Sequence, residues 1–382
     1  MIYEFGIVVI RTKSKVIIVA NTVWYLANFR LNLAIALIKA GYQVTMVAPP
    51  GDDSKKLVAA GICFIPVVMD NKGTNPVADM CLLWRLYALL SRERPAVFLG
   101  YTIKPNIYGG LACRMLKIPS IHNISGLGTA FINDSWVTRL VRLLYRVGLD
   151  KATKIFFQNP DDLSLFEKFQ LVDSCRTERL PGSGVDTHWF APTTLSESMD
   201  SCFCFLLFGR LLWDKGVGEY VEAARQLRGE GKEVEFQLLG FLDVENRSSI
   251  PRSIVEKWEV EGVIRYLGNS DDVRRVIAQA DCVVLPSYRE GTPRSLLEAA
   301  SMAKPIITTD SVGCRETIVD EVTGFLCKTR DADDLASKML KMMDLTNKER
   351  LAMGQCGREK MIQEFDEKIV IDRYLSVVEK SV

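Results

Sequence analysis

The chain has 382 residues, and its 48 lysines and arginines nearly balance 47 aspartates and glutamates, for a formal net charge of +1. This balance argues against nucleic acid as a partner. Hydrophobic residues make up 48% of the chain and charged residues 25%, a composition typical of a globular protein with two domains.

The ten cysteines include no CxxC pair, and several lie in apolar runs. Buried thiols in a reducing cytosol are therefore favoured over disulfides or zinc. No apolar run approaches the ~18 residues of a membrane span. The first residues, MIYEFGIVVIRTKSK, place Glu4 before a short apolar stretch and contain no small-residue cleavage site. We therefore expect no signal peptide and a cytoplasmic protein, with the role of residues 1–14 left open.

Strands and helices alternate along the chain, which is typical of parallel, doubly wound sheets covered on both faces. In the first half, the predicted strands are 15–21, 43–50, 63–69, 96–102, 120–126 and 154–160, and the predicted helices are 28–42, 52–62, 80–95, 104–119 and 136–148. In the second half, the predicted strands are 202–210, 234–240, 264–268, 281–286, 304–310 and 323–327, and the predicted helices include 216–231, 271–280, 331–343 and 367–380.

A segment rich in glycine and proline, LPGSGVDTHWFAP (180–192), separates the two halves and is typical of a linker. We predict an α/β fold of two Rossmann-like domains that face each other across a cleft. The first domain covers residues 1–184 and the second covers 185–365. A terminal helix, residues 366–382, is expected to pack back on the first domain.

The most informative motif is YREGTPRSLLEAASMAKPIITTD (288–310), which follows a predicted buried strand. Glu290 is placed on the loop after that strand, and Glu298 in the second turn of a helix that has Thr292 as its N-cap and Pro293 as its first residue. Ligands bind such units beyond the carboxyl ends of the strands. The N–H groups at the helix start favour an anion such as phosphate.

Two cations follow another strand of the same domain, Arg210 directly and Lys215 five positions later, before Gly216. Alone, they are better explained as solvated surface charges. Because they share a predicted sheet with the Glu290 loop, a diphosphate site becomes the favoured interpretation. Other nucleotide motifs fail: GxxxxGK[ST] is absent, and GLGTAF (126–131) lacks the last glycine of GxGxxG. The DAD at 331–333 is better explained by helix capping than by a metal.

These motifs carry a resemblance that covers the chain from about residue 15. FGRLLWDKG (208–216), the paired-glutamate stretch and GCRETI (313–318) resemble the family 4 retaining glycosyltransferases of the GT-B fold. In the first half, residues 21–49, 102–112 and SGLGTAFI (125–132) are similar to a subgroup that acts on undecaprenyl-diphosphate-linked sugars and includes N-acetylgalactosaminyltransferases. The resemblance implies an enzyme of the hexosyltransferase class that needs no metal and no other cofactor, with a UDP-sugar donor as substrate.

The resemblance also implies roles for individual residues. Glu298 is expected to bind the two ribose hydroxyls, and Glu290 the hydroxyls of the donor sugar. Arg210 and Lys215 are expected to stabilise the leaving diphosphate, so these two and Glu290 are the predicted catalytic residues. The further donor-binding residues are Gly209, Gly291, Thr292 and Pro293, together with Ser125 and Gly126 from the first domain. Ser125 and Gly126 occupy the place where many family members have a histidine, and His122 is interpreted as a strand residue.

The first domain is expected to hold the acceptor, a lipid-linked glycan. Tyr25, Asn28 and Arg30 follow the first strand, and Lys104 follows the strand at 96–102. Cations at two strand ends can meet a diphosphate, whereas the alternative is ordinary loop and helix-start residues.

The segment WVTRLVRLLYRVGL (136–149) predicts a basic amphipathic helix. Its apolar face is Trp136, Leu140, Val141, Leu144 and Val147, and its cations are Arg139, Arg142 and Arg146. Such a helix can rest on an anionic membrane surface, which predicts a peripheral protein on the inner face of the cytoplasmic membrane. The alternative is a helix packed on the sheet.

The predicted function is transfer of a hexose or N-acetylhexosamine, with N-acetylgalactosamine as the best candidate, to an undecaprenyl-diphosphate-linked sugar in bacterial surface polysaccharide or glycan assembly. UDP is preferred over GDP through the resemblance only. Two alternatives remain open: a sugar-nucleotide epimerase of the same two-domain form, and a non-catalytic nucleotide-sugar sensor.

Overall fold

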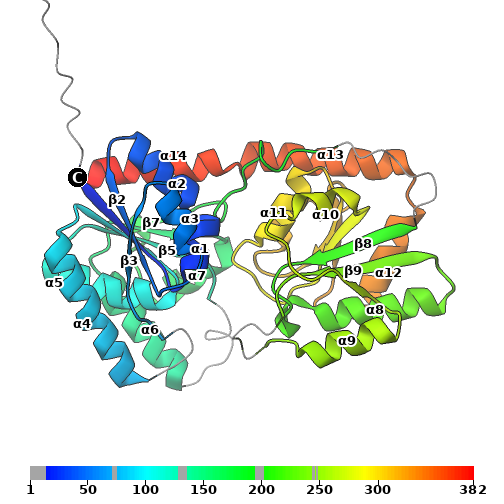
Figure 1. Cartoon of the computed structure of the whole chain (residues 1–382), viewed down its shortest axis with the longest axis horizontal. Helices are drawn as coiled ribbons and strands as arrows, with labels where there is room; N and C mark the ends of the chain where they lie inside the picture. Colours follow the sequence, from blue (N-terminus) through cyan, green and yellow to red (C-terminus); the bar gives the residue numbers. More distant parts are fainter. Residues whose placement is uncertain (1–13, 71–74, 128–135, 194–201, 243–245, 247) are drawn as a thin grey trace, which may run out of the picture. The chain divides into compact units, whose positions relative to one another are not determined.

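The structure is a computed structural model that describes residues 14–70, 75–127, 136–193, 202–242, 246 and 248–382. The chain divides into two compact units (Figure 1). Unit 1 comprises the described residues up to Arg179 together with Ile371–Val382, and unit 2 comprises Leu180–Val370. The division falls at the start of the segment 180–192.

Unit 1 contains a seven-stranded parallel sheet with the order β3-β2-β1-β4-β5-β6-β7. Its strands are β1 Lys15–Val19, β2 Gln43–Ala48, β3 Cys63–Pro66, β4 Val97–Tyr101, β5 Ser120–Ile124, β6 Lys154–Phe157 and β7 Thr177–Arg179. Its helices are α1 Val23–Phe29, α2 Leu31–Lys39, α3 Ser54–Ala59, α4 Pro76–Glu93, the π-helix η1 Pro105–Gly109, α5 Gly110–Leu116, α6 Trp136–Leu149, α7 Pro160–Lys168 and η3 Ser174–Arg176. The last helix of the chain, α14 Glu367–Ser381, belongs to unit 1 from Ile371 onward. The strand order reverses between β1 and β4, where doubly wound sheets bind ligands.

Unit 2 contains a six-stranded parallel sheet with the order β10-β9-β8-β11-β12-β13. Its strands are β8 Phe203–Phe208, β9 Val234–Leu239, β10 Arg265–Tyr266, β11 Cys282–Leu285, β12 Ile306–Thr309 and β13 Gly324–Cys327. Its helices are η4 Trp213–Lys215, α8 Val217–Gly229, α9 Arg252–Val260, α10 Arg274–Gln279, α11 Arg294–Ser301, η5 Arg315–Thr317, α12 Ala332–Asp344 and α13 Asn347–Glu364. Both units confirm the predicted α/β class and its parallel, Rossmann-like sheets.

Several predicted boundaries are wrong for local reasons. In place of the single helix predicted at 28–42, the chain forms the two helices α1 and α2. The first starts early because Thr22 caps it by accepting a hydrogen bond from Tyr25 N at 3.1 Å. The helix predicted to start at Thr292 starts at Arg294, with Pro293 as a cap that makes no side-chain hydrogen bond. Helices α7 and α9 and strand β7 were not predicted.

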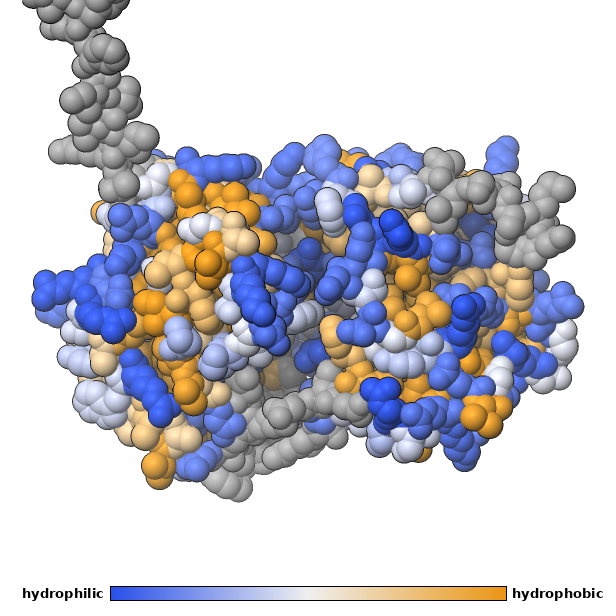
Figure 2. Space-filling view, in the orientation of Figure 1, coloured by the Kyte–Doolittle hydropathy of each residue, from blue (hydrophilic) through white to orange (hydrophobic). Residues whose placement is uncertain are grey.

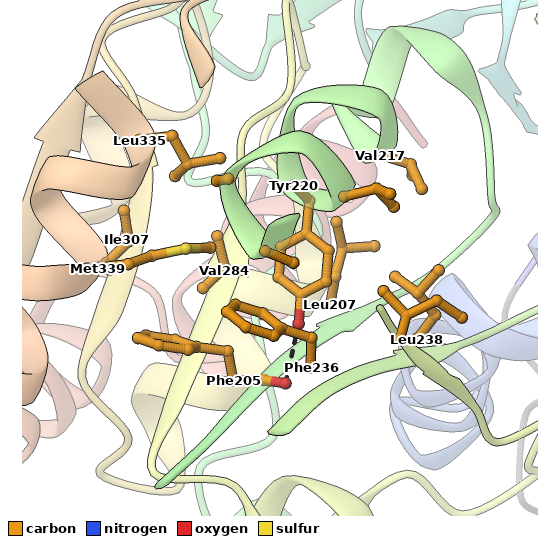
Figure 3. Packing of buried hydrophobic residues seen from close by; sticks show 14 of the residues in the cluster. Phe205, Leu207, Val217, Tyr220, Phe236, Leu238, Val284, Ile307, Leu335 and Met339 are labelled. Carbon is orange, nitrogen blue, oxygen red and sulfur yellow. Dashed lines mark hydrogen bonds between the residues drawn. The ribbon is translucent and has the colours of Figure 1, made fainter. Parts of the chain in front are cut away.

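The hydrophobic core of unit 2 fixes the positions of its central strands, whose carboxyl ends carry the predicted site residues. Side chains from β8, β9, β11 and β12 pack beneath helices α8 and α12 (Figure 3). The Phe205 and Phe236 rings stack with centroids 5.5 Å apart, and the Tyr220 hydroxyl of α8 donates to the Phe205 carbonyl at 2.8 Å. A buried hydroxyl bonded to a strand carbonyl fixes α8, and therefore its N-terminus, relative to β8.

Apolar side chains also reach the surface of unit 1, where Figure 2 shows them grouped among polar ones. Those on α4 are Val77, Met80 and Trp84, and those on α6 are Leu140, Leu143 and Val147. Among the helices of the described residues, none combines the length and the hydropathy that a membrane crossing requires.

Candidate active site

The predicted catalytic residues Lys215 and Glu290 are in contact at the carboxyl edge of the unit 2 sheet. Lys215 ends η4, after β8, and Glu290 lies on the loop after β11, the strand that pairs with β8. The Lys215 Nζ forms an ion pair with Glu290 Oε1, and the two side chains are 17% and 15% exposed. The pair is shielded enough to interact strongly, yet it remains reachable by a ligand.

Two glycines allow the loops around this ion pair to approach each other. Gly216 has φ +72°, and a Cβ there would lie 2.1 Å from the carbonyl oxygen of Pro286. Gly313 has φ +82°, and its Cβ would lie 2.3 Å from the carbonyl oxygen of Glu290. Any other residue at either position would push the loops apart, which explains the glycine after Lys215 in the sequence.

Ser287 holds the Glu290 carboxylate, a role that the sequence motif does not predict. Its Oγ lies 2.7 Å from Glu290 Oε1 and 3.1 Å from the Asp214 carbonyl oxygen. Its own carbonyl accepts hydrogen bonds from Thr309 Oγ1 and, at 3.0 Å, from Ser311 Oγ. The only local signal was a small polar residue directly after the buried strand.

Glu298 lies in the second turn of α11, as predicted, with its side chain 14% exposed. The Arg294 Nε donates to Glu298 Oε1 at 2.8 Å, one helical turn earlier. Burial raises the pKa of Glu298, and the Arg294 guanidinium opposes that rise. The carboxylate is therefore held in place by Arg294, a residue of the same motif with no predicted role.

The other predicted donor residues take different environments. In unit 2, Gly291 and Pro293 are buried, Thr292 is half-buried, and Gly209 and Arg210 are exposed after β8. Ser125 and Gly126 follow β5 in unit 1 and are half-buried, with φ +126° at Gly126. Residues 128–131 of the GLGTAF segment lie outside the described residues.

His122 is a structural residue of β5, as interpreted from the sequence. It is fully buried, with Nε2 3.0 Å from Ser120 Oγ and Nδ1 3.2 Å from Asn106 Oδ1. Burial lowers the pKa of His122 to about 3, so the ring is neutral at physiological pH. The DAD segment is also structural: Asp331 caps α12 by accepting from Asp334 N at 2.9 Å.

The residues predicted to bind the acceptor lie in unit 1 but do not form two exposed cations. Arg30 is only 1% exposed, and its Nη2 donates to the Tyr25 hydroxyl at 2.9 Å. Lys104 is paired with Asp79 of α4 at 2.7 Å. Asn28 donates to the Trp24 carbonyl at 2.9 Å. Of the two predicted cations, Arg30 is therefore buried and Lys104 is paired with a carboxylate, and their role at the acceptor stays a prediction.

The α6 surface differs in part from the predicted amphipathic helix. Leu140, Leu143 and Val147 are exposed together with Arg139 and Arg146. In contrast, Val141 and Leu144 pack against the core, and the Arg142 guanidinium lies 3.7 Å from the centroid of the Phe169 ring. The Trp136 side chain lies outside the described residues. The helix therefore packs on unit 1 through one face and presents a mixed apolar and basic face outward.

Two families of known proteins match consecutive parts of the chain. The family described as glycosyl transferase 4-like matches residues 15–159, and glycosyl transferases group 1 matches residues 199–360. The second match contains Lys215, Glu290 and Glu298.

Relatives match across both units. The N,N'-diacetylbacillosaminyl-diphospho-undecaprenol alpha-1,3-N-acetylgalactosaminyltransferase of Campylobacter jejuni is 27% identical over 92% of this chain and 95% of its own length. The UDP-Gal:alpha-D-GlcNAc-diphosphoundecaprenol alpha-1,3-galactosyltransferase of Escherichia coli is 26% identical over 79% of each chain.

Solved structures establish the fold. The Anabaena protein HepE, in complex with UDP and glucose, has a TM-score of 0.78 at 16% identity, covering 97% of this chain and 100% of that one. A glycosyltransferase from Rickettsia africae has a TM-score of 0.77 at 17% identity, covering 97% and 98%. The structural likeness shows the two-domain GT-B fold. Because each unit carries a glycosyltransferase family match and the two relatives are named glycosyltransferases, the chain belongs to the family 4 glycosyltransferases and is a hexosyltransferase.

Proposed function

We propose that this enzyme transfers an N-acetylhexosamine or hexose, with N-acetylgalactosamine as the first candidate, from a UDP-sugar to an undecaprenyl-diphosphate-linked sugar in bacterial surface polysaccharide or glycan assembly. The observation that carries the proposal is the Lys215–Glu290 ion pair at the carboxyl edge of the unit 2 sheet, with Glu298 on the helix behind it. The acceptor class is supported by the Campylobacter jejuni relative, which matches 92% of the chain and is named for such an acceptor.

In the proposed reaction, the bond between the sugar C1 and the β-phosphate oxygen breaks while a bond from C1 to the acceptor hydroxyl oxygen forms. Negative charge grows on the leaving diphosphate, and Lys215 with Arg210 stabilises it. The acceptor proton ends on the leaving diphosphate. Glu290 holds hydroxyls of the donor sugar, and Glu298 accepts from the two ribose hydroxyls.

The structure adds a constraint on Lys215. Its charge is engaged with Glu290, so an arriving diphosphate must share the ammonium with that carboxylate. In this proposal, the Ser287 hydroxyl, 2.7 Å from Glu290 Oε1, restrains the carboxylate during this exchange. Glu290 then stays in place for the donor sugar when Lys215 turns toward the phosphate.

We also propose retention of configuration, no covalent intermediate on the enzyme and no metal cofactor. Both named relatives make alpha linkages, and UDP-hexosamines carry their sugar in the α configuration. Two cations and the start of α11 can take over the role of a metal at the diphosphate.

The test of the function is a screen of UDP- and GDP-sugars against polyprenyl-diphosphate-linked monosaccharides in EDTA, with products identified by mass. We expect one added N-acetylhexosamine or hexose, with nucleoside diphosphate released only when acceptor is present. An isomerised nucleotide sugar formed without acceptor would support the epimerase instead, and binding without turnover would support the sensor. Activity that requires added magnesium or manganese would contradict the metal-free proposal.

We further propose that the outward face of α6 rests on an anionic membrane. Arg139 and Arg146 flank exposed Leu140, Leu143 and Val147, a combination that suits the lipid interface. The double change Arg139→Glu and Arg146→Glu is expected to weaken binding to anionic vesicles at low salt by about 30-fold or more, since each cation contributes about 1 kcal/mol. Arg142 is left unchanged because it packs on Phe169.

Vesicle co-sedimentation measures this effect. The matched control is Lys39→Glu with Lys55→Glu, which makes the same change of charge at exposed positions on α2 and α3 of the same unit. Activity on a short, water-soluble acceptor should persist in both variants. If the α6 variant stays folded and binds vesicles as well as the wild type, α6 does not dock on the membrane.

A further inference from the structure

A buried guanidinium in unit 1 lies among tyrosines rather than beside an acid. Arg30 joins α1 to α2, and its Cζ lies 4.2 Å from the Tyr101 ring centroid and 5.4 Å from that of Tyr25. Tyr374 of α14 stands next to this group, with its ring centroid 6.0 Å from that of Tyr101. In the described part of the chain, no carboxylate forms an ion pair with Arg30, and its Nε has no hydrogen-bond partner.

This arrangement leaves positive charge uncompensated at the carboxyl edge of the sheet. Aromatic faces attract a cation, but they do not neutralise it. Lys104, the other predicted acceptor cation, is already balanced by Asp79. A buried cation without an anion is costly, so such a group is usually kept where a ligand or a neighbouring group makes use of its charge.

The neighbouring group here is the Tyr25 hydroxyl. A guanidinium offers only donors, so the hydrogen bond of 2.9 Å from Arg30 Nη2 makes the Tyr25 oxygen an acceptor. The phenolic hydrogen must then point elsewhere, and within the residues that the structure describes it has no acceptor. A hydroxyl that accepts from a cation is also a stronger donor, because the two hydrogen bonds polarise each other.

Tyr25 can present that hydrogen to a ligand. It is half-buried in the first turn of α1, just after the carboxyl end of β1, and Trp24 beside it is 38% exposed. The strand order of the sheet reverses next to β1, where doubly wound sheets bind ligands.

Residues from three other elements hold the guanidinium in this position. Tyr101 ends β4, and Tyr374 comes from α14. The Tyr374 hydroxyl accepts from Asn123 Nδ2 at 3.1 Å, and Asn123 Oδ1 accepts from Gln158 Nε2 at 3.1 Å. Tyr101, Tyr374, Asn123 and Gln158 are all buried, and hydrogen bonds join the last three. Packing in the interior of unit 1 therefore sets the direction of the Arg30 donor toward Tyr25.

We propose that the Tyr25 hydroxyl, polarised by Arg30, donates a hydrogen bond to a phosphate oxygen of the lipid-diphosphate acceptor. A phosphate oxygen can only accept, and its negative charge complements the uncompensated cation, whereas a sugar hydroxyl offers neither feature. Arg30 is thus a positioning residue that acts through Tyr25, and it does not touch the acceptor itself. This inference rests on the proposed function, because it names how the diphosphate of that acceptor is recognised.

The test replaces Tyr25 with phenylalanine, which removes the hydroxyl and keeps the ring against Phe29. KM is measured for two acceptors of the same sugar, one linked to a polyprenyl diphosphate and one as an alkyl glycoside without phosphate. We expect the KM of the diphosphate acceptor to rise about tenfold while that of the alkyl glycoside stays within about twofold, with kcat and the donor KM unchanged. Arg30→Lys should give a loss of the same selective kind, because it keeps the charge but not the planar donor.

The matched control is Tyr87→Phe, which removes the hydroxyl of another half-buried tyrosine in unit 1 and should change neither KM. An equal rise of KM for both acceptors in Tyr25→Phe would overturn the inference, because a contact with the sugar or a general loss of structure acts on both. Unchanged values for both acceptors would overturn it as well.

A binding measurement separates this inference from the proposed function. With the donor site saturated by UDP, a short polyprenyl diphosphate without sugar is titrated into wild type and Tyr25→Phe by calorimetry. Weaker binding to the variant supports the inference even if no transfer is found, and equal binding overturns it. Failure of the wild type to transfer any sugar to the diphosphate acceptor would instead overturn the proposed function.

Discussion

Lys215→Ala is expected to lower turnover about a hundredfold or more and to weaken UDP binding much less, by analogy with the loss of an oxyanion donor. The reason is that charge on the diphosphate grows as the glycosidic bond breaks, so the ammonium contributes more to the transition state than to the bound donor. Its burial at 17% exposure strengthens the interaction, because little water screens it. Single-turnover rates at saturating donor, together with UDP titrations, separate the two effects.

The matched control for this change is Lys341→Ala. Lys341 also forms an ion pair in unit 2, with Glu321 at 2.6 Å, but its side chain is 47% exposed and belongs to α12. The same charge is lost, and turnover should stay near that of the wild type. Wild-type turnover in Lys215→Ala would end the assignment of Lys215 to the leaving group.

Glu298→Ala is expected to weaken UDP binding by about tenfold or more, because two hydrogen bonds from ribose hydroxyls to a carboxylate are lost together. Glu298→Gln keeps the shape and one acceptor oxygen, so it should lose less. Calorimetric titration of UDP into each variant measures the effect. Arg294→Ala is the comparison for the ion pair, because it removes the cation that holds Glu298 but keeps the carboxylate itself, so it should weaken UDP binding less than Glu298→Ala does.

The affinity for UDP is also expected to depend on pH through Glu298. Burial raises the pKa of Glu298, so its carboxylate takes up a proton at a higher pH than an exposed glutamate does. Only the ionised form accepts from both ribose hydroxyls, so UDP affinity should fall as the pH is lowered toward that raised pKa. Glu298→Gln should remove this acid limb. If UDP binds Glu298→Ala as tightly as the wild type at neutral pH, Glu298 does not hold the ribose.

The sequence by itself determined the features that depend on short-range pattern. Apolar runs, helical periodicity and the linker predicted the two parallel α/β units. The distance from the preceding strand predicted that Glu290 lies on a loop and that Glu298 lies one helical turn into α11. The cap at Asp331 followed from a polar residue before an apolar helical pattern. These features are local because a strand, a turn or a cap is decided by residues within a few positions of it.

The tertiary structure decided which charges have partners. Lys215 and Glu290 are 75 positions apart, and parallel strands bring them to one sheet edge. Arg30 lies against the Tyr101 ring, which in turn lies beside Tyr374 from a helix at the other end of the chain, so a cation predicted to meet the acceptor is buried. In the same way, folding pairs Lys104 with Asp79 and places the Arg142 guanidinium over the Phe169 ring. Whether a side chain is buried or paired depends on neighbours that are distant along the chain. The strength of a cation's interactions therefore depends on the local dielectric and on the partner that folding brings to it.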